Sequence, residues 1–130
     1  MAGRVVFFIE RGSFEPAFQA MSLAITAVAM GDEVILVFAF DALRQLARGT
    51  YGKPDSERER AEAARAEGMG VLTPGKMLAE ARALGAKTFA CDTTVKLCGI
   101  KESETREILD EVLGLASLWR FTDGARTLTF

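Results

Sequence analysis

Continuous apolar runs recur along the chain and predict its strands. Residues 4–9 (RVVFFI), 33–40 (EVILVFAF) and 87–90 (KTFA) are rich in β-branched and aromatic side chains. Runs of this kind are typical of strands that are buried on both faces of a parallel sheet. Two shorter segments, 111–113 and 127–130, predict a fourth and a fifth strand.

Helical periodicity fills the intervals between these runs. Over residues 14–28 the apolar side chains recur three or four positions apart, which predicts a helix that Ser13 caps and Gly31 ends. Thr73 followed by Pro74 has the form of a cap and a first helical residue. Because strands and helices alternate, we expect an α/β fold with a mostly parallel sheet and helices on both faces.

Shorter helices are expected in the remaining intervals. Asp41 can cap one after the second strand, and Ser103 can cap another before the fourth. A last helix is expected to bury Leu115, Leu118 and Trp119, because three large apolar side chains lie close together there.

The middle of the chain, residues 49–70, breaks this pattern. It is polar, dense in charge and almost free of large apolar residues. Opposite charges three positions apart, at Glu57/Arg60 and Glu62/Arg65, favour a solvated helix. Two interpretations stay open: a mobile lid over a site, or a plain surface insertion.

Composition narrows the class of protein. The 130 residues are 49% hydrophobic, which fits one domain over residues 1–130 with a substantial core. The net charge of −2 argues against nucleic acid or an anionic membrane surface as the main partner. The apolar run at the N-terminus is broken by Glu10 and Arg11 and is too short for a signal sequence. We therefore expect a protein of the reducing cytoplasm.

Histidine is absent and there are only two cysteines. This composition excludes a Ser/His/Asp triad, a Cys/His pair and any histidine-ligated metal, and two cysteines cannot form a four-cysteine zinc site. No metal site and no cofactor is predicted.

Candidate chemistry gathers where the predicted strands end. In open parallel sheets, ligands bind beyond the carboxyl ends of the strands. The residues expected at this edge are Gly12, Ser13, Asp41, Cys91, Asp92, Thr93 and Thr94.

Cys91 is the candidate working residue, because it ends the third strand and precedes a predicted short helix. The partial positive charge of a helix N-terminus favours a thiolate, which is the nucleophilic form, whereas the carboxylate of Asp92 opposes it. The alternative is that Cys91 is a small buried core residue. Cys98, seven residues on, is expected in the core beside Val95, so Cys91 is expected to alkylate first.

The segment ALGAKTFACDTTVKLCGI, residues 83–100, resembles the DsrE/DsrF-like family. The resemblance extends as a pattern over nearly the whole chain, from the apolar first strand to the terminal strand that ends in Phe. It implies a three-layer α/β/α sandwich of flavodoxin-like architecture, assembled into trimers or hexamers. It also implies a sulfur-relay role in which Cys91 carries sulfane sulfur as a persulfide. Cys98 is not part of the family pattern.

Three functions remain open at this point. The first is a sulfur carrier that exchanges sulfur with donor and acceptor proteins. Such a protein would act as a sulfurtransferase. The second is a non-catalytic oligomer that binds a small ligand or nucleotide at the carboxyl edge of the sheet. The third is a scaffold subunit.

Overall fold

The computed structural model describes residues 3–130, which form five strands and seven helices. The strands are β1 (Arg4–Ile9), β2 (Glu33–Phe38), β3 (Lys87–Cys91), β4 (Glu111–Leu113) and β5 (Arg126–Thr129). The helices are α1 (Phe14–Ala29), α2 (Phe40–Arg48), α3 (Glu57–Gly68), α4 (Pro74–Ala83), α5 (Asp92–Leu97), α6 (Glu102–Ile108) and α7 (Leu115–Arg120). All five predicted strands are confirmed.

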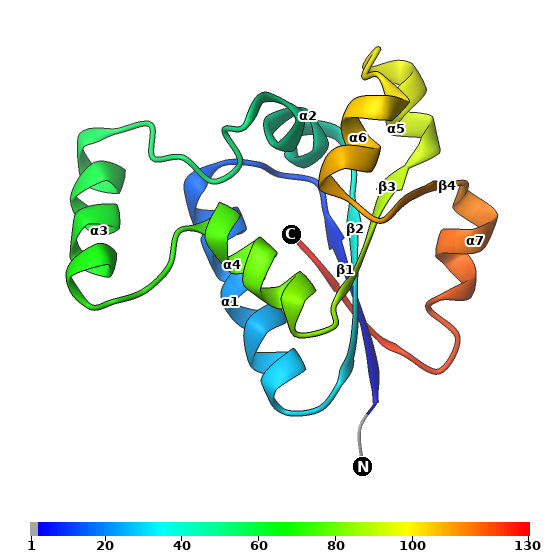
Figure 1. Ribbon diagram of the computed structural model, residues 1–130, viewed down its shortest axis with the longest axis horizontal. Helices are drawn as coiled ribbons and strands as arrows, with labels where there is room; N and C mark the ends of the chain where they lie inside the picture. Colours follow the sequence, from blue (N-terminus) through cyan, green and yellow to red (C-terminus); the bar gives the residue numbers. More distant parts are fainter. Residues whose placement is uncertain (1–2) are drawn as a thin grey trace.

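The strands form one parallel sheet in the order β4-β3-β2-β1-β5. Helices lie on both faces, so the predicted three-layer, flavodoxin-like α/β architecture is confirmed (Figure 1). The strand order differs from the 2-1-3-4-5 order of flavodoxin itself. Here β2, β3 and β4 are added in turn on one side of β1, and β5 is added on its other side.

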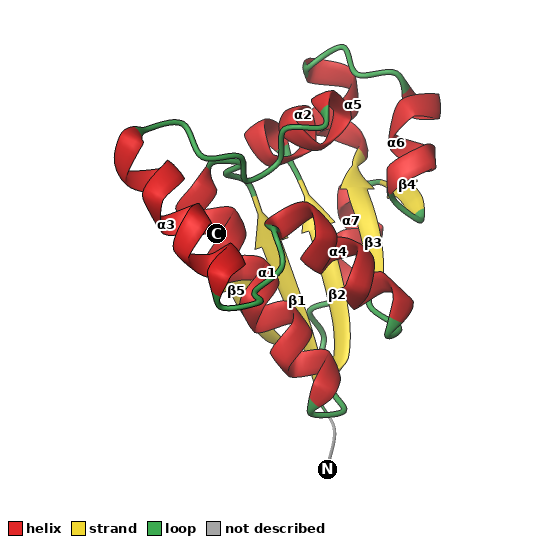
Figure 2. Ribbon diagram, turned by 60° about the vertical axis from the view of Figure 1, so that its left-hand side comes forward, coloured by secondary structure: helices red, strands yellow, loops and turns green. Residues whose placement is uncertain are grey.

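The two faces of the sheet carry separate apolar clusters. Successive side chains of a strand point to opposite faces, so Val5, Phe7 and Ile9 join one cluster while Val6 joins the other. Figure 1 shows α1 and α4 on one side of the sheet and α7 on the other, and Figure 2 shows α2 and α5 near the carboxyl ends of the strands. One face is thus covered by long helices and the other by a six-residue helix.

Small residues let α1 pack closely beside α4 and the sheet. Ala17, Ala20 and Ala24 on α1 and Ala81 on α4 are fully buried. An alanine surface lets backbones approach and leaves few voids, which is the state of a well-packed interior. Thr73 caps α4 as predicted, since its hydroxyl oxygen accepts a hydrogen bond from the Lys76 N–H at 3.3 Å.

Several predicted helix starts are wrong by one or two residues. β2 ends at Phe38, and α2 begins at Phe40 with Ala39 as its cap, so Asp41 lies inside the first turn. α6 begins at Glu102, which places Ser103 inside that helix. Asp41 accepts a hydrogen bond from the Gly12 N–H instead of capping α2, and the side chain of Ser103 is exposed to solvent.

The prediction that Leu115, Leu118 and Trp119 are buried is wrong for two of the three. Leu118 is buried, whereas Leu115 is 62% exposed and Trp119 is 72% exposed. The helix α7 buries only Leu118 on its inner side, and residues 3–130 supply no further layer outside it. Among residues 3–130, no helix is long and apolar enough to cross a membrane.

The charged middle of the chain does form the solvated helix that was expected. Ser56 caps α3 by accepting a hydrogen bond from the Glu59 N–H at 3.0 Å, and α3 buries none of its residues. The ion pairs differ from those expected. Arg58 bridges to Glu62 at 3.4 Å within the helix and to Glu15 on α1 at 2.9 Å.

Candidate functional site

Three of the predicted edge residues are brought together by hydrogen bonds between turns. The Gly12 N–H, after β1, donates to the Asp41 carboxylate at 3.0 Å. The Phe40 N–H, after β2, donates to the Thr94 hydroxyl oxygen at 3.3 Å. The turns that follow β1, β2 and β3 are therefore fastened to one another at the carboxyl edge of the sheet.

Gly12 is required by close packing. A Cβ built on Gly12 would lie 2.6 Å from Cγ of Gln45 and 2.9 Å from the backbone oxygen of Asp41. The Gly12 carbonyl also accepts a hydrogen bond from the Gly52 N–H at 2.9 Å. The turn is therefore a structural junction whose N–H and C=O groups already have partners.

Asp41 serves the same junction. Besides Gly12, its carboxylate accepts a hydrogen bond from the Gln45 side-chain amide at 3.3 Å and lies 3.6 Å from the Arg44 guanidinium. A carboxylate with three partners holds its place, so Asp41 fixes α2 against the β1 turn.

The remaining edge residues do not join this network. Ser13 is exposed at the cap position of α1, and its side chain makes no capping hydrogen bond. Asp92 forms an ion pair with Lys96 at 3.0 Å and, by hydrogen bonding to it, raises the pKa of that lysine. Thr93 is exposed.

Cys91 is the last residue of β3 and occupies the cap position of α5. The helix therefore begins at Asp92, and Thr93 and Thr94 lie inside its first turn. The side chain of Cys91 belongs to the apolar cluster on the α7 face, together with Val37, Phe89 and Leu118, and the residue is only 7% exposed. The thiol thus combines the predicted position at the strand end with the burial of a core residue.

Cys98 differs from the prediction of a core residue. It is half-buried, and its sulfur accepts a hydrogen bond from the Arg44 guanidinium at 3.2 Å. The short helix α5 ends there, with Cys98 as its C-terminal cap, so the side chain lies at the margin of the core. The sequence predicts that Cys91 is alkylated before Cys98. Cys91 is more buried than Cys98 in this structure, and burial of a thiol slows its alkylation.

One strained residue at this edge was missed by the sequence analysis. Phe40 has a φ of +45°, in the left-handed region that side-chain-bearing residues avoid, and its ring is exposed. Its N–H bond to Thr94 holds this conformation. Strained residues persist only where the surrounding structure holds them, and they are concentrated at functional sites. Its place between Ala39 and Asp41 in the sequence gave no signal of strain, since the apolar run predicted a strand as far as Phe40.

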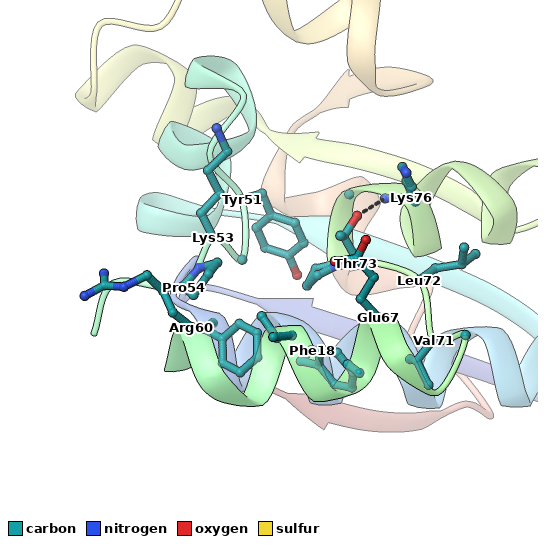
Figure 3. A pocket seen from close by; sticks show the side chains of 18 of the residues that line it. Phe18, Tyr51, Lys53, Pro54, Arg60, Glu67, Val71, Leu72, Thr73 and Lys76 are labelled. Carbon is teal, nitrogen blue, oxygen red and sulfur yellow. Dashed lines mark hydrogen bonds between the residues drawn. The ribbon is translucent and has the colours of Figure 1, made fainter. Parts of the chain in front are cut away.

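A second candidate site lies away from the cysteines, beneath α3. A cavity of about 690 Å³ is bounded by the start of α1, the 49–54 loop, α3 and the start of α4 (Figure 3). None of the seven predicted edge residues lines it. Tyr51 does line it, and this residue was missed by the sequence analysis. The available signal was an aromatic residue between Gly49 and Gly52 in an otherwise polar stretch.

Residues 3–130 bring together no group of three or more cysteine, aspartate or glutamate side chains that could hold a metal ion.

Comparisons with known proteins bear on the fold. No family model matches the chain, and no curated protein matches it. Among solved structures, the chain is similar to the crystal structure of the ychN protein from E. coli. The two share 24% sequence identity over 100% of each chain, with a TM-score of 0.66. At this identity the similarity establishes the α/β fold of the chain.

Proposed function

We propose that this protein is a sulfur carrier that holds sulfane sulfur as a persulfide on Cys91. The observation that carries the proposal is the place of this thiol, at the carboxyl end of β3 and directly before α5. That edge is where parallel sheets position reactive and binding groups. The resemblance of residues 83–100 to the DsrE/DsrF-like family supports it, and the fold shared with the ychN protein is compatible with it.

The transfer consists of two thiol–disulfide-type exchanges. The Cys91 thiolate attacks the terminal sulfur of a donor persulfide, a sulfur–sulfur bond forms, and the donor thiolate leaves. An acceptor thiolate then attacks the terminal sulfur on Cys91, and the Cys91 thiolate leaves in turn. Sulfane sulfur moves without net oxidation, so the proposed sulfurtransferase reaction uses no cofactor.

Access to the sulfur requires movement of its cover. The α7 face has one short helix over it, and only Leu118 of that helix is buried. Helices of six residues are unstable by themselves, since nucleation is unfavourable and few hydrogen bonds follow it. We propose that donor and acceptor proteins reach Cys91 by displacing α7 or the turn that precedes it.

A homo-oligomer is part of the proposal. Leu115 and Trp119 are four positions apart on α7 and therefore share one side of the helix, and both are exposed. An exposed aromatic and a neighbouring leucine are typical of protein contact sites. The family resemblance favours trimers or hexamers. The proposed compartment is the reducing cytoplasm, where free thiols persist.

The chain offers a direct test because it has two cysteines. The protein is incubated with a donor protein that carries a persulfide, and its intact mass is measured before and after dithiothreitol. We expect a gain of one sulfur atom that dithiothreitol removes, that persists in Cys98→Ser and that is lost in Cys91→Ser. A gain that follows Cys98 instead, or an unchanged mass in the presence of a cognate donor protein, contradicts the proposal.

A further inference from the structure

The cavity beneath α3 has the size of a small-molecule site. Its volume is about 690 Å³, within the range of roughly 300–1,000 Å³ in which drug-sized ligands are bound. It lies between the start of α1 and the continuous segment 49–76, which comprises the 49–54 loop, α3 and the start of α4 (Figure 3). The fold therefore forms this space by laying one charged segment over the start of α1.

Tyr51 is the feature of this cavity that most needs an explanation. The residue is 6% exposed, and its hydroxyl is buried without a hydrogen-bond partner. The ring is anchored edge-on against Phe38 at a centroid distance of 5.6 Å. Figure 3 shows the hydroxyl directed toward the middle of the lining side chains. Buried polar groups without a partner are rare in folded proteins and point to a missing ligand or water.

The hydroxyl is suited to donate a hydrogen bond. Burial raises the pKa of Tyr51 far above its ordinary value, so the proton stays on the oxygen at neutral pH. A ligand oxygen that accepts this proton would satisfy the orphaned group. An uncharged carbonyl or ether oxygen of a ligand is an acceptor that matches this neutral donor.

The walls of the cavity are apolar and its rim is cationic. Phenylalanine, proline, valine, leucine and alanine side chains supply most of the lining, among them Phe14, Phe18 and Ala63. The charged lining residues are Lys53, Arg60, Lys76 and Glu67. Within residues 3–130, none of the three cations forms an ion pair. The three cations outnumber the single acid, so the rim favours an anionic group.

The helix α3 can move relative to the cavity that it covers. It buries no residue, and its bridge to α1 joins the exposed side chains of Arg58 and Glu15. A second cavity of about 680 Å³ lies between α3 and α1 and is lined by both residues of that bridge. A helix with space on both sides and one exposed ion pair is weakly held, which gives a ligand a way in.

We propose that the cavity beneath α3 binds a small, elongated carboxylic acid. Its uncharged acceptor oxygen receives the Tyr51 hydroxyl, its apolar body packs against the phenylalanines, and its carboxylate lies at the Lys53, Arg60 and Lys76 rim. Of the two interpretations of residues 49–70, this proposal adopts the lid. It concerns a site separate from Cys91 and stands independently of sulfur transfer.

The proposal is tested by calorimetric titration of the full chain with two aromatic acids of the same shape. 4′-Acetylbiphenyl-4-carboxylate carries the carbonyl acceptor, and 4′-isopropylbiphenyl-4-carboxylate lacks it. We expect the acetyl compound to bind about tenfold more tightly, a difference of about 1.4 kcal/mol. Tyr51→Phe should remove this difference by weakening the acetyl compound alone, and a merely structural role for the hydroxyl would weaken both compounds equally.

The cationic rim is tested with the same probe. Lys53→Gln combined with Lys76→Gln should weaken binding and reduce its dependence on salt. The control is Lys87→Gln at the start of β3, which does not line the cavity and should leave binding unchanged. The proposal is overturned if neither acid binds at millimolar concentration, if Tyr51→Phe leaves the difference between the two acids intact, or if Lys87→Gln acts as strongly as the rim variants.

Discussion

The two faces of this sheet are covered by different amounts of apolar structure. On one face, α1 and α4 run along the sheet and bury a large cluster that includes Phe7, Met21 and Leu36. On the other face, the six-residue α7 contributes only Leu118 to a small cluster that contains Cys91. Cys91, the residue that we propose to carry sulfur, therefore lies on the thinly covered side, where opening disrupts the fewest contacts.

The same comparison explains why the apolar residues are distributed as they are. The deep face has alanines where helices approach closely, and the thin face has Leu115 and Trp119 directed outward. Large apolar side chains that face solvent on a single helix are a feature of surfaces that meet another protein. The exposed Leu115 and Trp119 are therefore the reason why the proposed oligomer contacts are assigned to the thin face.

Truncation of one leucine on each face should give the largest and clearest difference. Leu78 on α4 and Leu118 on α7 are 4% and 3% exposed, so they are matched in burial. Leu78→Ala should lower the free energy of unfolding by about 4 kcal/mol, and Leu118→Ala by about 2 kcal/mol, because the thin face can relax around the cavity. Urea denaturation measures both values. Equal losses would mean that the two faces are packed equally well.

A polar cluster ties the deep face to the edge strand from which α7 follows. The Asp110 carboxylate accepts hydrogen bonds from the Thr88 N–H at 2.7 Å, from the Thr88 hydroxyl at 3.0 Å and from the Arg82 guanidinium at 3.0 Å. Partial burial acts to raise the pKa of Asp110, but the three hydrogen bonds together outweigh it and lower that pKa.

This cluster predicts an acid-sensitive contribution to stability. A carboxyl group whose pKa is lowered by folding stabilises the fold at neutral pH, and that contribution is lost as the pH falls below about 4, through the lowered value. Asp110→Asn should lower the free energy of unfolding at pH 7 by about 1 kcal/mol, a modest figure because the side chain is nearly half exposed. Thermal unfolding from pH 7 to pH 3 provides the test. A variant as sensitive to acid as the parent would show that Asp110 is not the titrating group.

The exposed side of α7 should matter for assembly and little for the stability of the single chain. Trp119→Lys is expected to change the free energy of unfolding by less than about 0.5 kcal/mol, as exposed substitutions usually do. Light scattering should nevertheless show that the oligomer shifts toward the monomer. The matched control is Leu84→Lys, which alters an exposed leucine at the end of α4. If the parent protein is monomeric, or if both variants shift the oligomer equally, the thin face is not the assembly surface.

Sequence patterns predicted the strands well because a strand that is buried on both faces needs a continuous apolar run. β1 and β4 have the predicted bounds, and β3 ends at Cys91 as expected. The helix starts were harder, because Asp41, Ser103 and Thr93 are all competent to cap. Local propensity cannot choose between neighbouring caps when hydrogen bonds between turns, such as that of Gly12 with Asp41, decide the outcome.

The candidate site was predicted only as a location. The edge that holds Gly12, Asp41 and Thr94 could be inferred, because the carboxyl ends of parallel strands lie together. The burial of individual side chains could not be inferred. The pattern of apolar and polar residues identifies an apolar face of a helix, but it does not show whether another part of the same chain packs against that face. That is why Trp119 was expected inside the fold and Cys98 in the core. Tyr51 was missed because only the folded cavity shows its hydroxyl to be without a partner.

The last prediction concerns the rates at which the two thiols react. In the free protein, iodoacetamide should modify the half-buried Cys98 before the buried Cys91, which reverses the order expected from position alone. Leu118→Ala weakens the cover of the α7 face and should accelerate modification of Cys91 about tenfold for each 1.4 kcal/mol by which opening becomes easier. The rate at Cys98, whose neighbour Arg44 lies on α2, should stay constant. Peptide mapping over time separates the two sites, and Leu78→Ala controls for a general loss of stability. If Leu78→Ala accelerates Cys91 as much as Leu118→Ala does, Cys91 is exposed by global unfolding, and the thin face is not the route to its sulfur.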